Sequence, residues 1–395
     1  MAGTVGSGLL AYIAVTLSAR LLGASEFGLL GAILAISSAA TVLLRPLSYA
    51  ATQLAAALHT QAGAASVRGL GGLAIAVGSV LAVFLPILLA AVAVPIGAVL
   101  QTTDVWTIVS LGPLIAAIVC LQLMTGILAG AHRFTWLAAT LVVDAAIRAL
   151  VIGPLAVLVG VSGAVAAYAV GQVSAVGFSI ACLGGPSRRL PTLRELFSAL
   201  RVGTSAALLL GAVAMLQHGD LLLLRWYGRP EDAGLYAACA TIGNLFITLA
   251  GPLFVPAFSR ALVAHRGCRP TLPILLGALT PIVAAGVFAS LAAIWLGNPI
   301  AKLLFGAGFD GSGSILPAYL AKTTALVVSG TVGQHSLATA RGKAVHWAFV
   351  PALLGLATVV LVRPGPVGAA VTMFVAGAVL ATWIGIMTWV QPPDA

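Results

Sequence analysis

The sequence predicts an all-α, polytopic membrane protein that crosses the bilayer about twelve times. Of its 395 residues, 61% are hydrophobic and 7% are charged, and the mean hydropathy is +1.13. Soluble globular domains carry roughly 25% charged residues, so a surface of this composition has to face lipid. A membrane-spanning helix needs roughly 20 apolar residues, and with loops the length allows about twelve. Continuously apolar runs such as 73–94 exclude a transmembrane β-barrel, whose strands alternate apolar and polar residues.

Polar breaks between the apolar runs mark the predicted helix ends. The first helix, 5–22, has no Lys or Arg before Arg20, so we interpret it as an uncleaved span and not as a signal peptide. The second, 28–57, is long for one crossing, and Arg45-Pro46 predicts a kink inside it. The remaining predicted helices are 69–96, 105–128, 136–159, 163–183, 202–224, 234–257, 271–296, 314–338, 345–362 and 366–390.

The charges in the loops predict that both termini are cytoplasmic, because cytoplasmic loops carry the excess of Lys and Arg. The loops on that side would hold Arg68, Arg133, Arg188, Arg189, Arg194, Arg201, Arg260, Arg266, Arg269, Arg341 and Lys343. The opposite loops would hold only Arg20, Arg225, Arg229, Lys302 and Arg363. The net charge of +10 then reflects topology and contact with anionic lipid headgroups. Bases spread over short loops argue against a nucleic-acid partner.

The two halves of the chain resemble each other, which predicts two six-helix lobes. The segment from Arg20 to Leu29 and the segment from Arg225 to Leu235 share Arg, Gly and Glu at matching spacing, with one insertion. Six predicted helices separate the two copies, so the lobes are parallel repeats around a central cavity. We expect an N-terminal lobe, a cytoplasmic basic linker and a C-terminal lobe over residues 1–183, 184–201 and 202–395.

Motifs for enzymatic chemistry are missing from the sequence. The four cysteines, Cys120, Cys182, Cys239 and Cys268, form no metal-binding spacing. The chain has no GxxxxGK[ST] phosphate loop, so it cannot hydrolyse ATP by that route. We therefore expect no enzyme activity, no cofactor and no metal.

Ionisable residues within apolar runs are the candidate functional residues, since they are costly in a membrane unless paired or hydrated. Arg45 lies inside the second predicted helix with no acid within four residues. Asp144 and Arg148 share one helix face at i,i+4 spacing. We interpret Arg45 as a cavity residue that meets an anionic group, because a guanidinium suits phosphate. Asp144 and Arg148 either neutralise each other or face the cavity as well.

Two further charges lie in the second half. Asp220 lies near the end of the seventh predicted helix, beside His218. One interpretation is that its carboxylate pairs with Arg225. Lys322 lies in the tenth helix, where it either snorkels outward or faces the cavity. Together, Arg45, Arg148 and Lys322 are candidates for binding an anionic head group, and Asp144, Asp220 and His218 are candidates for gating or coupling.

Several motifs together resemble a known family, the Wzx-type polysaccharide flippases of the multidrug/oligosaccharidyl-lipid/polysaccharide exporter superfamily. Arg20-Leu-Leu-Gly-Ala-Ser-Glu-Phe-Gly-Leu is similar to the stretch after that family's first helix. Asp220-Leu-Leu-Leu-Leu-Arg-Trp-Tyr-Gly, followed by Ala233-Gly-Leu-Tyr-Ala-Ala, resembles the "DxLLLGRFLG…AGLYAAA" segment of that family. Ile127-Leu-Ala-Gly-Ala-His-Arg-Phe is similar to that family's loop between helices four and five, and Leu303-Leu-Phe-Gly-Ala-Gly-Phe fits its C-terminal positions. The likeness therefore covers nearly the whole chain.

The resemblance implies a plasma-membrane transporter that flips a polyprenyl-diphosphate-linked saccharide precursor by alternating access. It implies a lipid-linked saccharide as substrate, and glycosyltransferases or a polymerase of the same pathway as partners. One alternative is a cation-coupled small-molecule exporter of the same fold, although the embedded acids such exporters use are few here. Another is a membrane scaffold of a polysaccharide-synthesis complex that transports nothing itself.

Overall fold

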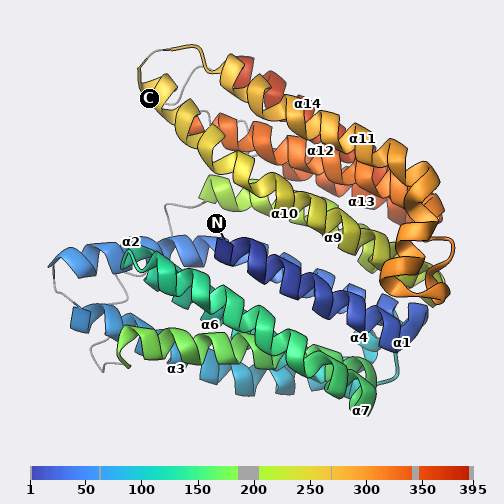
Figure 1. Ribbon diagram of the computed structural model, residues 1–395, viewed down its shortest axis with the longest axis horizontal. Coiled ribbons are helices and arrows are strands. Elements are labelled where there is room, and N and C mark those ends of the chain that lie inside the picture. The colour runs from blue at the N-terminus through green and yellow to red at the C-terminus, as the bar shows by residue number, and fades with distance from the viewer. Residues whose placement is uncertain (1, 62–63, 186–203, 268, 340–346, 391–395) are drawn as a thin grey trace. The chain divides into compact units, whose positions relative to one another are not determined.

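The computed structural model describes residues 2–61, 64–185, 204–267, 269–339 and 347–390, and all the elements within these ranges are helical (Figure 1). The elements are α1 Ala2–Leu43, α2 Arg45–Gln61, α3 Ala64–Ala91, α4 Ala93–Leu100, α5 Val105–Val109, α6 Leu111–Gly130, α7 Phe134–Leu183, α9 Thr204–Tyr227, α10 Pro230–Arg266, α11 Leu272–Phe305, the 3₁₀ turn η2 Ala307–Phe309, α12 Ser312–Ala338, α13 Phe349–Val362 and α14 Pro366–Val390.

These helices make the chain a multi-pass membrane protein. Eight helical stretches among the described residues are long and apolar enough to cross a membrane. Two of them are double length, Gly6–His59 and Phe134–Leu183, and each covers two of the predicted crossings. Every predicted helix therefore has a helical counterpart, since α10 and the shorter α13 fall where crossings are expected. The all-helical fold class is confirmed.

Two glycines divide the double-length helices. Gly23 in α1 has φ 74° and ψ 174°, and Gly160 in α7 has φ 65° and ψ −139°. Residues with a Cβ rarely adopt such conformations, so the chain turns at these glycines while helix continues on both sides. The predicted break at 22–28 is thus a single-residue turn at Gly23. The predicted kink at Arg45-Pro46 is also present, but it is a break at Leu44, after which Arg45 begins α2.

The chain forms two compact units. The first comprises residues 1–22 and 36–204, and the second comprises 23–35 and 205–395. In the first unit α6 packs against α2, α3 and α7; in the second α12 packs against α10, α11 and α14. Both α6 and α12 cover the fourth predicted crossing of their half, so the sequence repeat has a counterpart in packing. The predicted domain limits stay a prediction, because the linker lies outside the described residues apart from Gly184 and Gly185.

Residues 23–35 belong to the second unit although they precede most of the first. They pack against the start of α10 through residues without bulky side chains. A Cβ at Gly234 would lie 1.8 Å from the carbonyl oxygen of Ala24, and one at Gly31 would lie 2.5 Å from Cβ of Ala237. In lipid, such close approach of small residues is a main source of helix association.

Aromatic and polar contacts reinforce this packing. The buried ring of Phe27 lies 6.2 Å from that of Phe305 and 5.6 Å from that of Phe309, measured between centroids. The buried guanidinium of Arg225 donates a hydrogen bond of 3.1 Å to the carbonyl oxygen of Ser25. This carbonyl lies just after the turn at Gly23, so the contact fixes the direction in which the helix resumes.

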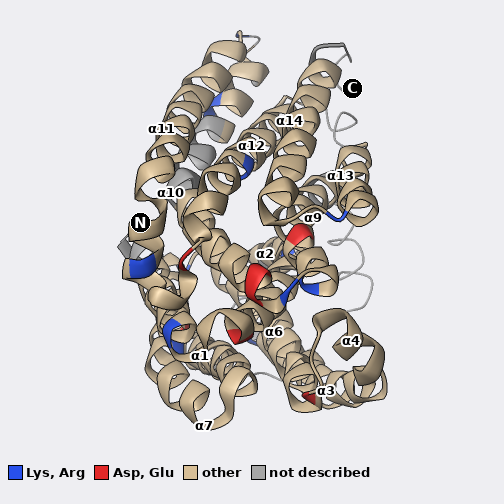
Figure 2. Cartoon of the chain, turned by 90° about the vertical axis from the view of Figure 1, so that its right-hand side faces the viewer, with Lys and Arg blue, Asp and Glu red and all other residues tan. Residues whose placement is uncertain are grey.

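The surface of the helices suits lipid. Phe84 of α3 and Phe288 of α11 are 70% and 75% exposed. Figure 2 shows that most of the ribbon carries no charged residue and that the charged positions are isolated along the helices. The few charges inside the helices are therefore the places to look for a functional site.

We predict that Gly234→Ala lowers the thermal unfolding midpoint of the purified protein by several degrees. The added methyl group overlaps backbone at the crossing with residues 23–35, and overpacking of this kind costs about 1–3 kcal/mol. The matched control is Gly277→Ala in α11, where a Cβ meets nothing within 4 Å. That change should leave the midpoint equal or higher, because Ala favours helix over Gly; equal effects of the two substitutions would contradict the close crossing.

Candidate functional site: two buried charged clusters

A buried ion pair lies inside the second unit. Nζ of Lys322, on α12, is 2.5 Å from Oδ2 of Asp220, on α9, and both side chains are 0% exposed. Nζ also donates to the carbonyl oxygen of Gln217 at 3.1 Å. Asp220 is therefore paired with Lys322 and not with Arg225, and Lys322 does not snorkel to the surface.

Two buried tyrosines complete the surroundings of this pair. The hydroxyl group of Tyr236, on α10, donates to Oδ2 of Asp220. Nζ of Lys322 lies 4.5 Å from the ring centroid of Tyr319 and 5.6 Å from that of Tyr236. The other oxygen of Asp220 accepts the backbone N–H of Leu221 at 2.9 Å. Each charge thus has an opposite charge and further polar or aromatic contacts, as a buried ion pair requires.

The first unit holds a second cluster, on the two arms of α7. Nη1 of Arg148 lies 3.8 Å from Oδ2 of Asp144, and Cζ of Arg148 lies 4.7 Å from the ring centroid of Tyr168. Asp144 and Arg148 are on the arm before Gly160, and Tyr168 is on the arm after it. The i,i+4 pairing expected from the sequence is present, and Tyr168 joins it from the returning arm.

The two arms pack in a regular antiparallel register. At the ends of the arms far from the turn at Gly160, the rings of Trp136 and Phe178 lie 6.1 Å apart between centroids. The hydroxyl groups of Thr140 and Ser179 are hydrogen-bonded at 3.0 Å. Nearer the turn, a Cβ on Gly171 would lie 2.8 Å from the carbonyl oxygen of Asp144.

In this register Gly171 lies against Asp144, and Tyr168 lies next to Arg148. Gln172 follows Gly171 directly and stands about one helical turn after Tyr168. Both charged residues lie near the middle of their arm, so the cluster falls near the middle of the membrane.

The polar atoms of this α7 cluster are incompletely paired, unlike those of the Lys322–Asp220 pair. Four of them are buried and have no hydrogen-bond partner within the part of the chain that the structure describes: Asp144 Oδ1, Arg148 Nε, Tyr168 OH and Gln172 Oε1. Buried polar groups without partners are rare in proteins and are often sites of function or of bound water.

Arg45 differs from the other predicted bases because its side chain is exposed. Among the salt bridges of the described residues, none includes Arg45. At 1.5 Å per residue, the helix from Gly23 reaches Arg45 after about 30 Å, roughly one hydrocarbon thickness. Arg45 is thus better placed at the level of the lipid headgroups than deep inside the second crossing.

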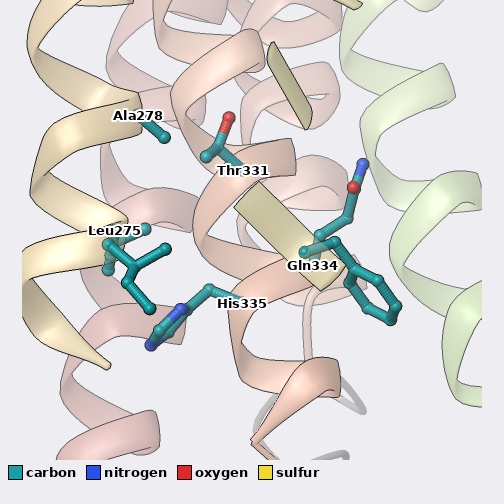
Figure 3. Close-up of a pocket in the computed structure, with 7 residues that line it drawn as sticks. Leu275, Ala278, Thr331, Gln334 and His335 are labelled. Carbon is teal, nitrogen blue, oxygen red and sulfur yellow. The ribbon is translucent and has the colours of Figure 1, made fainter. Parts of the chain in front are cut away.

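A small pocket lies between α11 and α12, where Leu275 and Ala278 face Thr331 and His335 (Figure 3). It has room for about one water molecule, and the hydroxyl group of Thr271 lies 3.3 Å from Nε2 of His335. A pocket of this size cannot hold a saccharide or a lipid head group, and none of the predicted site residues lines it.

The structure thus groups the predicted residues as two separate pairs and one exposed base. His218 is buried on α9, two residues before Asp220. Sequence reasoning missed Tyr168, Gln172, Tyr236 and Tyr319. A usable signal existed for two of these, because Tyr168 and Gln172 are polar residues at i,i+4 spacing in an apolar run.

Comparison with known proteins agrees with this architecture. A family described as "Polysaccharide biosynthesis protein" matches residues 1–262. An inward-facing multidrug resistance MATE family transporter of the MOP superfamily has a similar structure, with TM-score 0.80 and 14% identity over 98% of this chain and 96% of that one. The lipid II flippase MurJ, in an inward closed conformation, has TM-score 0.77 and 16% identity over 99% and 87%. No curated protein matches the chain.

We predict that Lys322→Met and Asp220→Asn each destabilise the protein strongly, by about 3–5 kcal/mol, because each leaves an unpaired charge or polar group in the interior. The double variant should recover much of this loss, since it removes both charges. A double-mutant cycle on thermal unfolding measures the coupling. Additive effects of the two substitutions would show that the ion pair contributes nothing to stability.

Proposed function

Because the chain belongs to the polysaccharide biosynthesis protein family, we propose that it moves a polyprenyl-diphosphate-linked saccharide precursor from the inner to the outer leaflet of the plasma membrane by alternating access. The fold supports a transporter, since it is shared with a lipid flippase and a multidrug exporter. The apolar helix surfaces suit a substrate whose lipid tail stays in the bilayer while its head crosses.

The observation that best supports this proposal is the exposed side chain of Arg45. Its guanidinium stands at a helix break, at the level where the diphosphate of a membrane lipid lies, and no salt bridge of the described residues neutralises it. A guanidinium binds phosphate oxygens through two parallel hydrogen bonds. Arg45 is therefore the base best placed to receive the anionic head group.

The other predicted bases have different surroundings. Lys322 and Arg148 each already contact a carboxylate, Asp220 and Asp144 respectively, so their attraction for an anion is reduced. We assign the Lys322–Asp220 pair to holding α9 and α12 together as the second unit moves, with His218 beside it. Arg148 and Asp144 would contact substrate only in a state that exposes the α7 cluster.

The basic loops support a plasma-membrane orientation with both termini in the cytoplasm. In this orientation the turn at Gly23 lies on the outer side, and Arg45 lies near the inner leaflet, where the substrate is made. Enzymes that build or polymerise the saccharide are the partners this function implies, and the chain itself would carry out transport without an enzymatic step.

A cation-coupled exporter of small molecules is the second candidate, favoured by the likeness to the MATE family transporter. Such coupling requires an embedded carboxylate able to take up a cation. Asp220 already binds Lys322 and Asp144 already binds Arg148. This pairing favours the lipid-linked saccharide.

We predict that Arg45→Ala lowers the rate of lipid-linked saccharide transfer in proteoliposomes at least tenfold, because loss of a charged hydrogen-bonding pair costs about 1.5–3 kcal/mol. Arg45→Lys should retain only part of the activity, since a lysine cannot form the two parallel bonds.

The matched control is Arg229→Ala, which removes an exposed arginine from the start of another helix and should leave the rate unchanged. Transfer by Arg45→Ala at the wild-type rate would exclude Arg45 from the substrate path. Wild-type protein that moves drugs in a cation-dependent way, and no lipid-linked saccharide, would establish the second candidate instead.

A further inference from the structure

We propose that the α7 cluster of Asp144, Arg148, Tyr168 and Gln172 is a binding site for the neutral hydroxyl groups of a sugar ring. This inference rests on the proposed function, because it assigns to that substrate a second contact, separate from the diphosphate. The proposal rests on four buried polar atoms that have no partner within the described residues, two on each arm of one helical hairpin.

The packing around the cluster shows that the unpaired atoms are confined to one level of the hairpin. Away from the turn, the arms are joined by the Thr140–Ser179 hydrogen bond and by the Trp136–Phe178 ring contact. At the next level, Asp144 and Arg148 meet the returning arm at Gly171 and Tyr168. The missing partners are thus a local property of this level and not of loose packing along α7.

The chemistry of the four atoms selects the ligand. Asp144 Oδ1 and Gln172 Oε1 are acceptors, Arg148 Nε is a donor, and Tyr168 OH can donate or accept. A hydroxyl group donates one hydrogen bond and accepts others, so two neighbouring hydroxyl groups of a pyranose satisfy this mixed set.

Other ligands fit less well. A phosphate group offers only acceptors, and the carboxylate of Asp144 repels it. A metal ion or ammonium group requires acceptors, and the guanidinium of Arg148 repels it. The pairing of Asp144 with Arg148 at 3.8 Å makes the cluster close to neutral, as a site for an uncharged sugar should be.

The small residue at the crossing lets the arms close when the site is empty. The absence of a side chain at Gly171 brings the returning arm against Asp144, which shields the four atoms from solvent. Binding therefore requires the arms of α7 to separate at this level, and the hydroxyl groups of the sugar then supply the hydrogen bonds that the closed hairpin lacks.

The first experiment measures thermal unfolding of the purified full-length protein with and without methyl β-D-glucopyranoside. At a concentration ten times the dissociation constant we expect the unfolding midpoint of wild type to rise by about 2 °C beyond the general stabilisation by a sugar cosolvent. Tyr168→Phe and Gln172→Leu, alone and together, should lose this gain. The control is Ser174→Ala, which changes a half-buried serine on the same arm whose hydroxyl group donates to the carbonyl oxygen of Val170; this variant should keep the gain.

The unliganded variants provide a second measurement. Tyr168→Phe removes a hydroxyl group that has no partner, so the unfolding midpoint without sugar should stay equal or rise. A clear fall would assign the hydroxyl group to structure and overturn the proposal. The proposal would also be overturned if the glucoside raised the unfolding midpoint of wild type and of the variants equally. It would be overturned as well if sodium chloride or inorganic diphosphate stabilised wild type and these variants abolished that stabilisation.

The transport assay separates this inference from the proposed function. The transport probe is polyprenyl diphosphate that carries one hexose. The Tyr168→Phe, Gln172→Leu double variant should transfer this probe several-fold more slowly than wild type. In the unfolding assay, Arg45→Ala should still be stabilised by free glucoside. Wild type that responds to glucoside but moves no lipid-linked hexose would refute the proposed function and leave the sugar site standing. Transfer by the double variant at the wild-type rate would refute the sugar site alone.

Discussion

The constraint on which this structure depends is that the membrane interior offers no water to a polar group. Each backbone N–H and C=O must find its partner within the chain, so the spanning segments are helical. The same constraint governs the side chains. Lys322 and Asp220 are tolerated at 0% exposure because each meets the other at 2.5 Å, with Gln217 and Tyr236 supplying further hydrogen bonds.

The buried charges of the two units differ in how completely they are paired. The pair in the second unit is saturated and joins α9 to α12, with Tyr236 of α10 completing it. The cluster on α7 keeps four polar atoms that have no partner in the part of the chain that the structure describes, although the hairpin arms are joined by a hydrogen bond and a ring contact nearby. A saturated pair stabilises one arrangement, whereas an unsaturated cluster favours any ligand that completes it. This contrast is why we propose that α7 recognises the sugar, in addition to the head-group contact proposed for Arg45, and that Lys322 and Asp220 hold their helices together.

Packing between helices follows from the same solvent. Lipid tails are as apolar as leucine, so helices associate through close contact and not through the hydrophobic effect. The crossing of residues 23–35 with α10 shows this, because Gly31 and Gly234 leave no room for a Cβ. Gly23 supplies the turn that directs this segment to the second unit, and Arg225 holds the turn through the carbonyl oxygen of Ser25.

The sequence by itself determined the membrane location, the helical fold, the twelve apolar segments and the Asp144–Arg148 pair, because these depend on local composition and on i,i+4 spacing. It could not determine that Asp220 pairs with Lys322, which is 102 residues away, or that Arg45 begins a helix with its side chain exposed. Nor could it show that Tyr168 lies next to Arg148 across the hairpin. Those contacts depend on the turn at Gly160 and on the register of the helices it joins, and only tertiary packing sets that register.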